Sequence, residues 1–103
     1  MKTFFYPRSM VVVGASPTKQ NLGHLILINN VQRGCTVRLY GVGSEEGEIA
    51  GVHVYRNVAD LPEVPDLALF IIPAAAIPDQ LEECGKLGIR RVVIESGGFS
   101  EFS

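Results

Sequence analysis

The sequence is poor in charge, and the charges it has are scattered. Only 19% of its 103 residues are Asp, Glu, Lys or Arg, and the formal net charge at pH 7 is -2. Lysine and arginine form no basic stretch of the kind that attracts a nucleic-acid backbone. The chain also lacks an apolar run near the roughly 20 residues that a membrane span needs. We therefore expect neither a nucleic acid nor a membrane as its partner.

Cysteine is scarce as well, with Cys35 and Cys84 far apart in the sequence. Neither belongs to a C-x-x-C motif, so the pair predicts two reduced thiols rather than a disulfide. The first residues lead directly into an apolar strand and lack the long hydrophobic core and cleavage site of a secretory signal peptide. Together these features predict a cytoplasmic protein.

The chain has few residues suited to catalysis or metal binding. His24 and His53 are its two histidines, and no group of His, Cys, Asp and Glu has the spacing of metal ligands. No serine lies in a G-x-S-x-G nucleophile elbow. We therefore predict no metal site and no catalytic residue in this chain.

The sequence does contain short apolar blocks that alternate with helical patterns. The blocks are continuous and rich in β-branched residues, as in parallel strands that are covered on both faces. This pattern predicts an α/β fold: a Rossmann-like open parallel sheet of about five strands with helices on both faces. The strands are expected near residues 10–13, 37–42, 49–55, 67–72 and 91–94, with helices from Leu22 or Gly23 to Gly34 and over residues 77–87.

The length fits one domain that spans residues 1–103. In the second helix Ile77, Leu81, Cys84 and Leu87 share one apolar face, whereas polar residues such as Gln80 are expected to face solvent. A glycine loop follows the last strand, and in this winding scheme such a loop normally leads into another helix. We therefore expect the chain to be the N-terminal piece of a longer protein.

Candidate ligand-binding residues lie in the loops after the predicted strands, because open parallel sheets bind ligands at the carboxyl ends of their strands. After the first strand, Gly14 permits a tight turn and Gly23 permits close backbone approach. The amide groups of this crossover are expected to be free and to attract a phosphate at the start of the helix. The candidates are Gly14, Ala15, Ser16, Lys19, Asn21, Leu22 and Gly23 in the first loop, Val42 and Gly43 after the second strand, Ile72, Pro73 and Ala74 after the central strand, and Ser96, Gly97 and Gly98 after the last.

The second strand indicates which nucleotide is bound. A site for NAD needs an Asp or Glu about 20 residues beyond the glycines to bind the ribose hydroxyls. The stretch from His24 to Ser44 contains neither. This absence favours a cofactor that is phosphorylated on its adenosine ribose, as coenzyme A and NADP both are. The arginine pair that NADP sites prefer does not follow the second strand, which disfavours an NADP-dependent oxidoreductase.

Several short stretches are informative when taken in order: residues 5–9, 13–16, 22–23, 49–52, 55, 61–62, 65–67, 72–74 and 96–101. Together they resemble the N-terminal CoA-binding domain of the NDP-forming acyl-CoA synthetases, relatives of the succinyl-CoA synthetase alpha subunit. The resemblance implies coenzyme A as the cofactor and the remaining domains or subunit of an acyl-CoA synthetase as partners. It also implies that the first loop and the proline loop hold the cofactor, whose thiol points toward the final glycine loop. These roles fall on Gly14, Ser16, Gly23, Pro73, Ser96 and Gly97.

One segment departs from the family pattern. The family usually has a proline-valine-asparagine-proline segment followed by a basic residue, whereas residues 41–45 of this chain end in Glu45. An acidic residue is therefore expected near the adenosine end of the cofactor.

The resemblance further implies that the domain alone is catalytically incomplete and that the parent protein is an acid–thiol ligase, which joins an acyl group to coenzyme A. Two alternatives remain open. One is a stand-alone CoA-binding or CoA-sensing protein, and the other is the NADP-binding half of an oxidoreductase.

Overall fold

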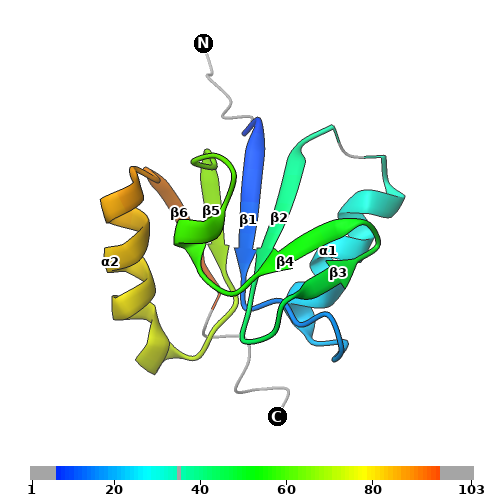
Figure 1. The fold of residues 1–103 in the computed structure, drawn as a ribbon, viewed down its shortest axis with the longest axis horizontal. Helices are drawn as coiled ribbons and strands as arrows, with labels where there is room; N and C mark the ends of the chain where they lie inside the picture. Colours follow the sequence, from blue (N-terminus) through cyan, green and yellow to red (C-terminus); the bar gives the residue numbers. More distant parts are fainter. Residues whose placement is uncertain (1–6, 35, 96–103) are drawn as a thin grey trace.

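A computed structural model describes residues 7–34 and 36–95 of the chain. A twisted sheet forms its centre, with one helix on each face (Figure 1). The strands lie in the order β3-β4-β2-β1-β5-β6. The elements are β1 (Ser9–Val13), α1 (Leu22–Gln32), β2 (Arg38–Val42), β3 (Gly47–Ile49), β4 (Val52–Tyr55), the 3-10 turn η1 (Val58–Asp60), β5 (Leu67–Phe70), the 3-10 turn η2 (Ala74–Ala76), α2 (Ile77–Leu87) and β6 (Arg91–Ile94).

Five of these strands run parallel, namely β4, β2, β1, β5 and β6, and β3 pairs with β4 in the antiparallel direction. The predicted Rossmann-like α/β sheet with helices on both faces is confirmed. The single extended segment predicted at residues 49–55 is instead a hairpin. Ala50 and Gly51 form its two-residue turn with positive φ angles of 50° and 89°, as tight hairpin turns require.

The two faces of the sheet bury separate hydrophobic cores, because successive side chains of a strand point to opposite faces. On the α1 face, Leu27 packs with Val12 and the neighbouring strands. On the other face, Cys84 of α2 packs with Val11 and Phe70. All five side chains are at most 1% exposed. No helix in the described part of the chain is long and apolar enough to cross a membrane.

The winding of the chain reverses at the centre of the sheet. From β1 the chain passes through α1 to β2, on one side, and it later enters β5 on the other side of β1. From β5 it continues through α2 to β6. The connections after β1 and β5 therefore diverge, and the carboxyl ends of an open α/β sheet bind ligands at such a switch point.

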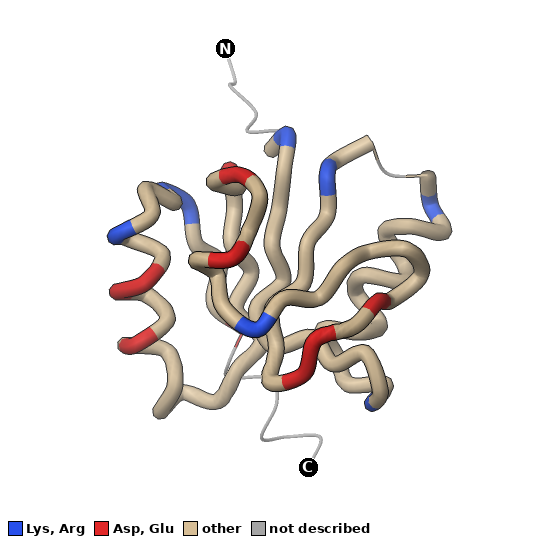
Figure 2. Tube along the Cα trace, in the orientation of Figure 1, with Lys and Arg blue, Asp and Glu red and all other residues tan. Residues whose placement is uncertain are grey.

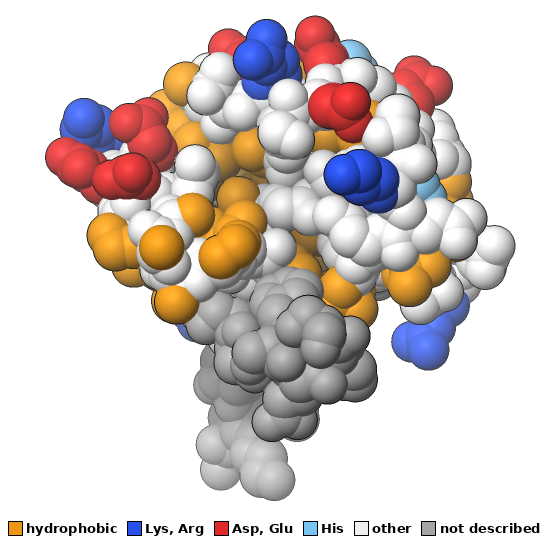
Figure 3. Space-filling view, turned by 90° about the horizontal axis from the view of Figure 1, so that it is seen from below, with side chains coloured by type: hydrophobic (Ala, Val, Ile, Leu, Met, Phe, Trp, Pro, Cys, Tyr) orange, Lys and Arg blue, Asp and Glu red, His pale blue; other side chains and the backbone are white. Residues whose placement is uncertain are grey.

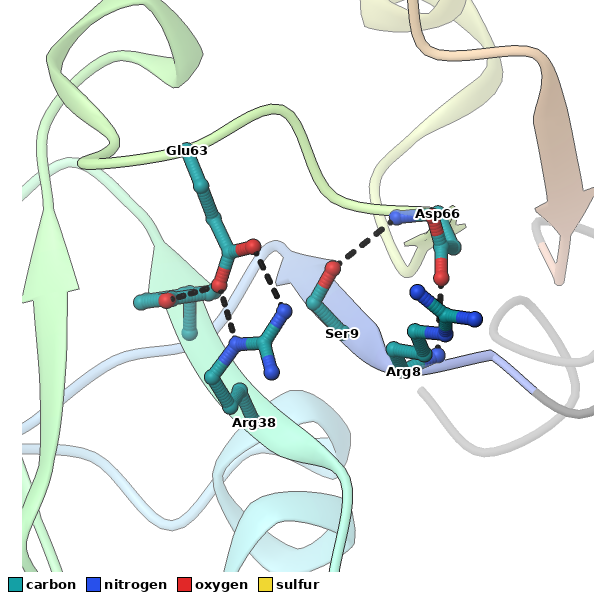
Figure 4. A network of polar contacts seen from close by, with 6 residues as sticks. Arg8, Ser9, Arg38, Glu63 and Asp66 are labelled. Atoms are coloured by element: carbon teal, nitrogen blue, oxygen red, sulfur yellow. Dashed lines mark hydrogen bonds and ion pairs between the residues drawn. The ribbon is translucent and has the colours of Figure 1, made fainter.

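The amino edge of the sheet is held by a polar network (Figure 4). Arg38 Nε and Nη2 donate to the two carboxylate oxygens of Glu63 at 2.6 and 2.8 Å, and the Tyr40 hydroxyl also donates to Glu63. Beside them, the amide of Asp66 donates to Ser9 Oγ at 3.1 Å. Figure 2 shows basic residues at the starts of β1 and β2, the edge of the sheet at which this network lies. The network ties the segment before β5 to the first two strands.

These contacts shift the pKa values of Glu63 and Tyr40. Hydrogen bonds from Arg38, and next from Tyr40, lower the pKa of Glu63 from its ordinary 4.5 to about 2. Burial, followed by the hydrogen bond to Glu63, raises the pKa of Tyr40. Because the pKa of Glu63 is depressed in the folded state, its contribution to stability is present above pH 4.5 and is lost as the pH falls toward 2.

The substitution Glu63→Gln should therefore lower the free energy of unfolding at pH 7 and weaken its decline between pH 4.5 and 2. Urea unfolding at pH 7, 4.5 and 3 measures both effects. The control is Glu82→Gln, since Glu82 only faces Lys86 across 3.9 Å with both side chains largely exposed. This control should retain the acid-induced loss of the wild type. An unchanged pH dependence in Glu63→Gln would contradict the role given to Glu63.

Candidate functional site

A cleft of about 450 Å³ opens at the carboxyl ends of the strands, at the switch point. Figure 3 views the molecule from this edge, where apolar side chains gather next to α2 and acidic side chains lie on the outer side of that helix. The wall of the cleft is formed by the four segments that follow β1, β2, β4 and β5, together with α2. The cleft is lined by eight of the predicted residues: Gly14, Ala15, Ser16, Asn21, Val42, Gly43, Ile72 and Pro73.

The other predicted residues do not line the cleft or are not described. Lys19, Leu22, Gly23 and Ala74 lie outside its lining. Ser96, Gly97 and Gly98 fall outside the described residues. Sequence reasoning missed five lining residues: Val13, Ser44, Arg56, Ile71 and Gln80.

Glycines allow the loops of the cleft to pack backbone against backbone. A Cβ atom on Gly43 would lie 2.0 Å from the carbonyl oxygen of Ala15, and one on Gly14 would lie 2.1 Å from that of Ile71. A Cβ on Gly23 would lie 2.8 Å from the Gly14 oxygen. No side chain fits at these positions, because real Cβ contacts are longer. The glycines thus bring the ends of β1, β2 and β5 together.

The substitution Gly43→Ala should push the loop after β2 away from Ala15. We expect a loss of about 1–3 kcal/mol in the free energy of unfolding, as for other overpacked sites. Gly85→Ala is the matched control, because a Cβ there meets nothing within 4 Å and alanine favours the helix by about 1 kcal/mol. Thermal and urea unfolding of both variants measure the effect. A Gly43→Ala variant as stable as the wild type would contradict this packing.

Two amides expected to be free are in fact paired. The amides of Gly14 and Ala15 donate to the carbonyl oxygen of Val42 at 2.7 and 3.1 Å. The expectation of free amides is therefore wrong for these two residues, because the loop after β1 continues the pairing of β1 with β2. Leu22 and Gly23 differ, since their amides are the first two of α1 and donate no hydrogen bond within the described residues.

The polar side chains of the first loop mainly hold the loop itself. Ser16 Oγ accepts hydrogen bonds from the amides of Thr18 and Lys19 at 3.3 and 3.0 Å. Asn21 caps α1, with Oδ1 accepting from the amide of His24 and Nδ2 donating to the Gly14 oxygen, both at 2.9 Å. These bonds fix the loop's shape, and they leave the first two amides of α1 open at the positive end of the helix.

His24 and Glu45 are both tied to this loop. His24 is 9% exposed, and its Nδ1 lies 2.5 Å from the carbonyl oxygen of Ser16. A carbonyl can only accept, so Nδ1 carries the proton. Glu45 accepts a hydrogen bond from Thr18 Oγ1 at 2.6 Å. It does not line the cleft, although the sequence places it just after β2.

Two of the missed residues bring polar groups to the cleft. Arg56 directly follows β4, and Gln80 lies in the first turns of α2. Gln80 Oε1 is buried and has no hydrogen-bond partner in the described part of the chain. The prediction that Gln80 faces solvent is therefore wrong. The rule that ligands contact residues after strands could have found Arg56, because the extended segment predicted at residues 49–55 also ends directly before it. No sequence signal marked Gln80.

The structure contains no other cluster suited to chemistry in the part of the chain it describes. No three His, Cys, Asp or Glu side chains within residues 7–34 and 36–95 come together as a metal site would require. Cys84 is a free, buried thiol, and burial, followed by the nearby Glu83, raises its pKa. It therefore stays protonated and belongs to the core.

A doubly wound sheet with a glycine-lined cleft at its switch point defines a Rossmann-like domain of the kind that binds nucleotide cofactors. Residues 8–102 match the family model described as a CoA binding domain. The chain belongs to this family, whose ligand is coenzyme A, and it is homologous to a domain of the ADP-forming acyl-CoA synthetases.

Known proteins agree with this membership. The ADP-forming acetate–CoA ligase of Methanocaldococcus jannaschii is 36% identical over 101 residues, which are 98% of this chain and 14% of the ligase. The dinucleotide-forming acetyl-coenzyme A synthetase 1 of Ca. Korarchaeum cryptofilum matches with a TM-score of 0.83 and 30% identity, covering 96% of this chain and 22% of that one. A conserved hypothetical protein from Pyrococcus furiosus matches with a TM-score of 0.74 and 26% identity, over 92% of this chain and 84% of its own. The chain thus spans less than a quarter of these two synthetases.

Proposed function

We propose that the cleft at the switch point is the coenzyme A site of this domain. The observation that carries the proposal is the position of the cleft: eight residues predicted as cofactor contacts line one cavity where this fold binds ligands. We assign the same role to the predicted residues outside the cleft lining, Lys19, Leu22, Gly23 and Ala74, and to Ser96, Gly97 and Gly98. Coenzyme A supplies a thiol as acyl acceptor, and these residues bind and orient it.

The cleft and the start of α1 together offer groups that fit the two ends of coenzyme A. The unpaired amides of Leu22 and Gly23 and the cation of Arg56 suit its phosphates. The buried Gln80 Oε1 suits an amide N–H donor, and the pantetheine arm contains two. An unpaired buried acceptor destabilises the free protein, and a ligand that donates to it recovers that free energy.

We further propose that the chain serves as the CoA-binding part of a longer ADP-forming acyl-CoA synthetase, an acid–thiol ligase. Its identity of 36% to an acetate–CoA ligase seven times its length supports this role. In such a protein the remaining domains or subunit would bind the nucleotide and transfer the phosphoryl group. The acyl substrate of such a ligase is a carboxylic acid. We also propose a cytoplasmic location, which the free, buried thiol of Cys84 fits.

A second candidate is a stand-alone CoA-binding or CoA-sensing protein. It is favoured by the match to the protein from Pyrococcus furiosus, of which the domain covers 84%. In that case the domain would act through binding alone. The two candidates share the same cleft and differ in whether other domains use the bound thiol.

Calorimetric titration of the purified chain tests the shared proposal. We expect one coenzyme A per chain, with ATP and NADP binding at least about tenfold more weakly, because neither carries a pantetheine arm for Gln80 and the apolar wall. Equal affinities for coenzyme A and NADP would favour the oxidoreductase alternative instead. Absence of coenzyme A binding would contradict the assignment of the cleft.

The substitution Gln80→Leu tests the pantetheine contact separately. Removing an unpaired buried acceptor should raise the free energy of unfolding of the free protein by about 1 kcal/mol. The affinity for coenzyme A should fall about three- to tenfold, whereas the affinity for ADP, which lacks pantetheine, should not change. Gln32→Leu at the exposed end of α1 is the matched control. Unchanged affinity for coenzyme A in Gln80→Leu would show that Gln80 is no contact.

A further inference from the structure

The position of Arg56 is fixed by the pairing of β4 with β2. In this parallel pair Val42 lies opposite Tyr55, and the amide of Gly43 donates to the carbonyl oxygen of Tyr55 at 2.9 Å. Arg56 is the next residue of the chain. It therefore lies beside the loop that follows β2, although it is 13 positions beyond Gly43 in the sequence.

Arg56 is the single charged residue among the described residues that line the cleft. Its side chain has no ion pair or hydrogen bond within the described part of the chain. The acidic residues of the adjacent loop have partners of their own. Glu45 accepts from Thr18 Oγ1 at 2.6 Å, and Glu46 Oε2 lies 3.3 Å from His53 Nε2. The cation at the cleft is thus left for an anion from outside the chain.

The side of the cleft on which Arg56 lies indicates which anion. In doubly wound folds the adenosine ribose lies near the end of the strand that follows the first crossover, here β2. A carboxylate at this place binds the ribose hydroxyls, whereas an arginine accommodates a phosphate on the ribose. The cleft contains no carboxylate among its described lining residues, and the arginine comes from the neighbouring strand.

Building on the proposed coenzyme A site, we propose that Arg56 binds the phosphate on the adenosine ribose of the cofactor. A guanidinium group suits this task, because its planar fork can donate two hydrogen bonds to one phosphate. Arg56 thereby selects coenzyme A over its precursor without that phosphate. The sequence directly after β2 contains no basic residue. Arg56 provides a positive charge beside the same loop, because β4 pairs with β2.

The test compares coenzyme A with 3′-dephospho-coenzyme A by calorimetric titration of the whole chain and of Arg56→Gln. We expect the wild type to prefer coenzyme A about tenfold to hundredfold, the range for hydrogen bonds to charged groups. In Arg56→Gln the affinity for coenzyme A should fall to that for the dephosphorylated form, which itself should not change. The preference of the wild type should also shrink as salt is raised.

Arg90→Gln is the matched control, because it removes the same charge from the amino edge of the sheet. It should keep the wild-type preference. If Arg56→Gln lowers the affinities for both ligands equally, Arg56 contacts the pyrophosphate and the inference is overturned. Unchanged affinities for both ligands would overturn it as well. If the wild type binds both forms equally well, the inference fails while the proposed function stands. If it binds neither, the proposed function fails first. The unfolding midpoint of Arg56→Gln should equal that of the wild type, because the side chain has no partner to lose.

Discussion

Direct backbone contact between three loops shapes the carboxyl edge of the sheet. Gly43 lies against the carbonyl oxygen of Ala15, and Gly14 lies against that of Ile71, at distances that exclude any side chain. The same proximity lets the oxygen of Val42 accept the amides of Gly14 and Ala15. The glycines of this edge thus serve the packing of the protein first, and the cleft is the space that remains where the three loops diverge.

The two edges of the sheet differ in how fully their polar groups are paired. At the amino edge, Glu63 is bound by Arg38 and Tyr40, which stabilises the fold. At the carboxyl edge, the buried oxygen of Gln80 and the cation of Arg56 have no partner within the described residues. The buried, unpaired oxygen of Gln80 costs stability in the free protein, whereas the exposed Arg56 is solvated. Both groups lie at the edge where we propose that coenzyme A binds.

Much of the fold could be predicted from the sequence, because apolar periodicity directly reflects which faces are buried. The apolar run from Val11 to Val13 marks β1, and Asn21 caps the start of α1. Gly88, whose φ is 93°, ends α2. The hairpin could not be predicted, since nothing in the alanine at position 50 indicates its positive φ. The lining of the cleft could be predicted where it consists of consecutive residues after a strand, as in the loop after β1. Two lining residues were missed because their positions depend on tertiary packing. Arg56 lies at the cleft because β4 pairs with β2, and the buried oxygen of Gln80 lies on a helix face that is otherwise polar.

The walls of the cleft extend from Val13 to Gln80 and come from both sides of the switch point. A molecule bound there contacts segments that separate when the domain unfolds. It therefore binds only the folded state, and its binding free energy adds to the stability of the whole domain. At a ligand concentration one hundred times Kd the gain is about 2.7 kcal/mol. The lifetime of this small domain against proteases should therefore follow the supply of its cofactor, and its abundance would reflect metabolic state without any dedicated regulatory element.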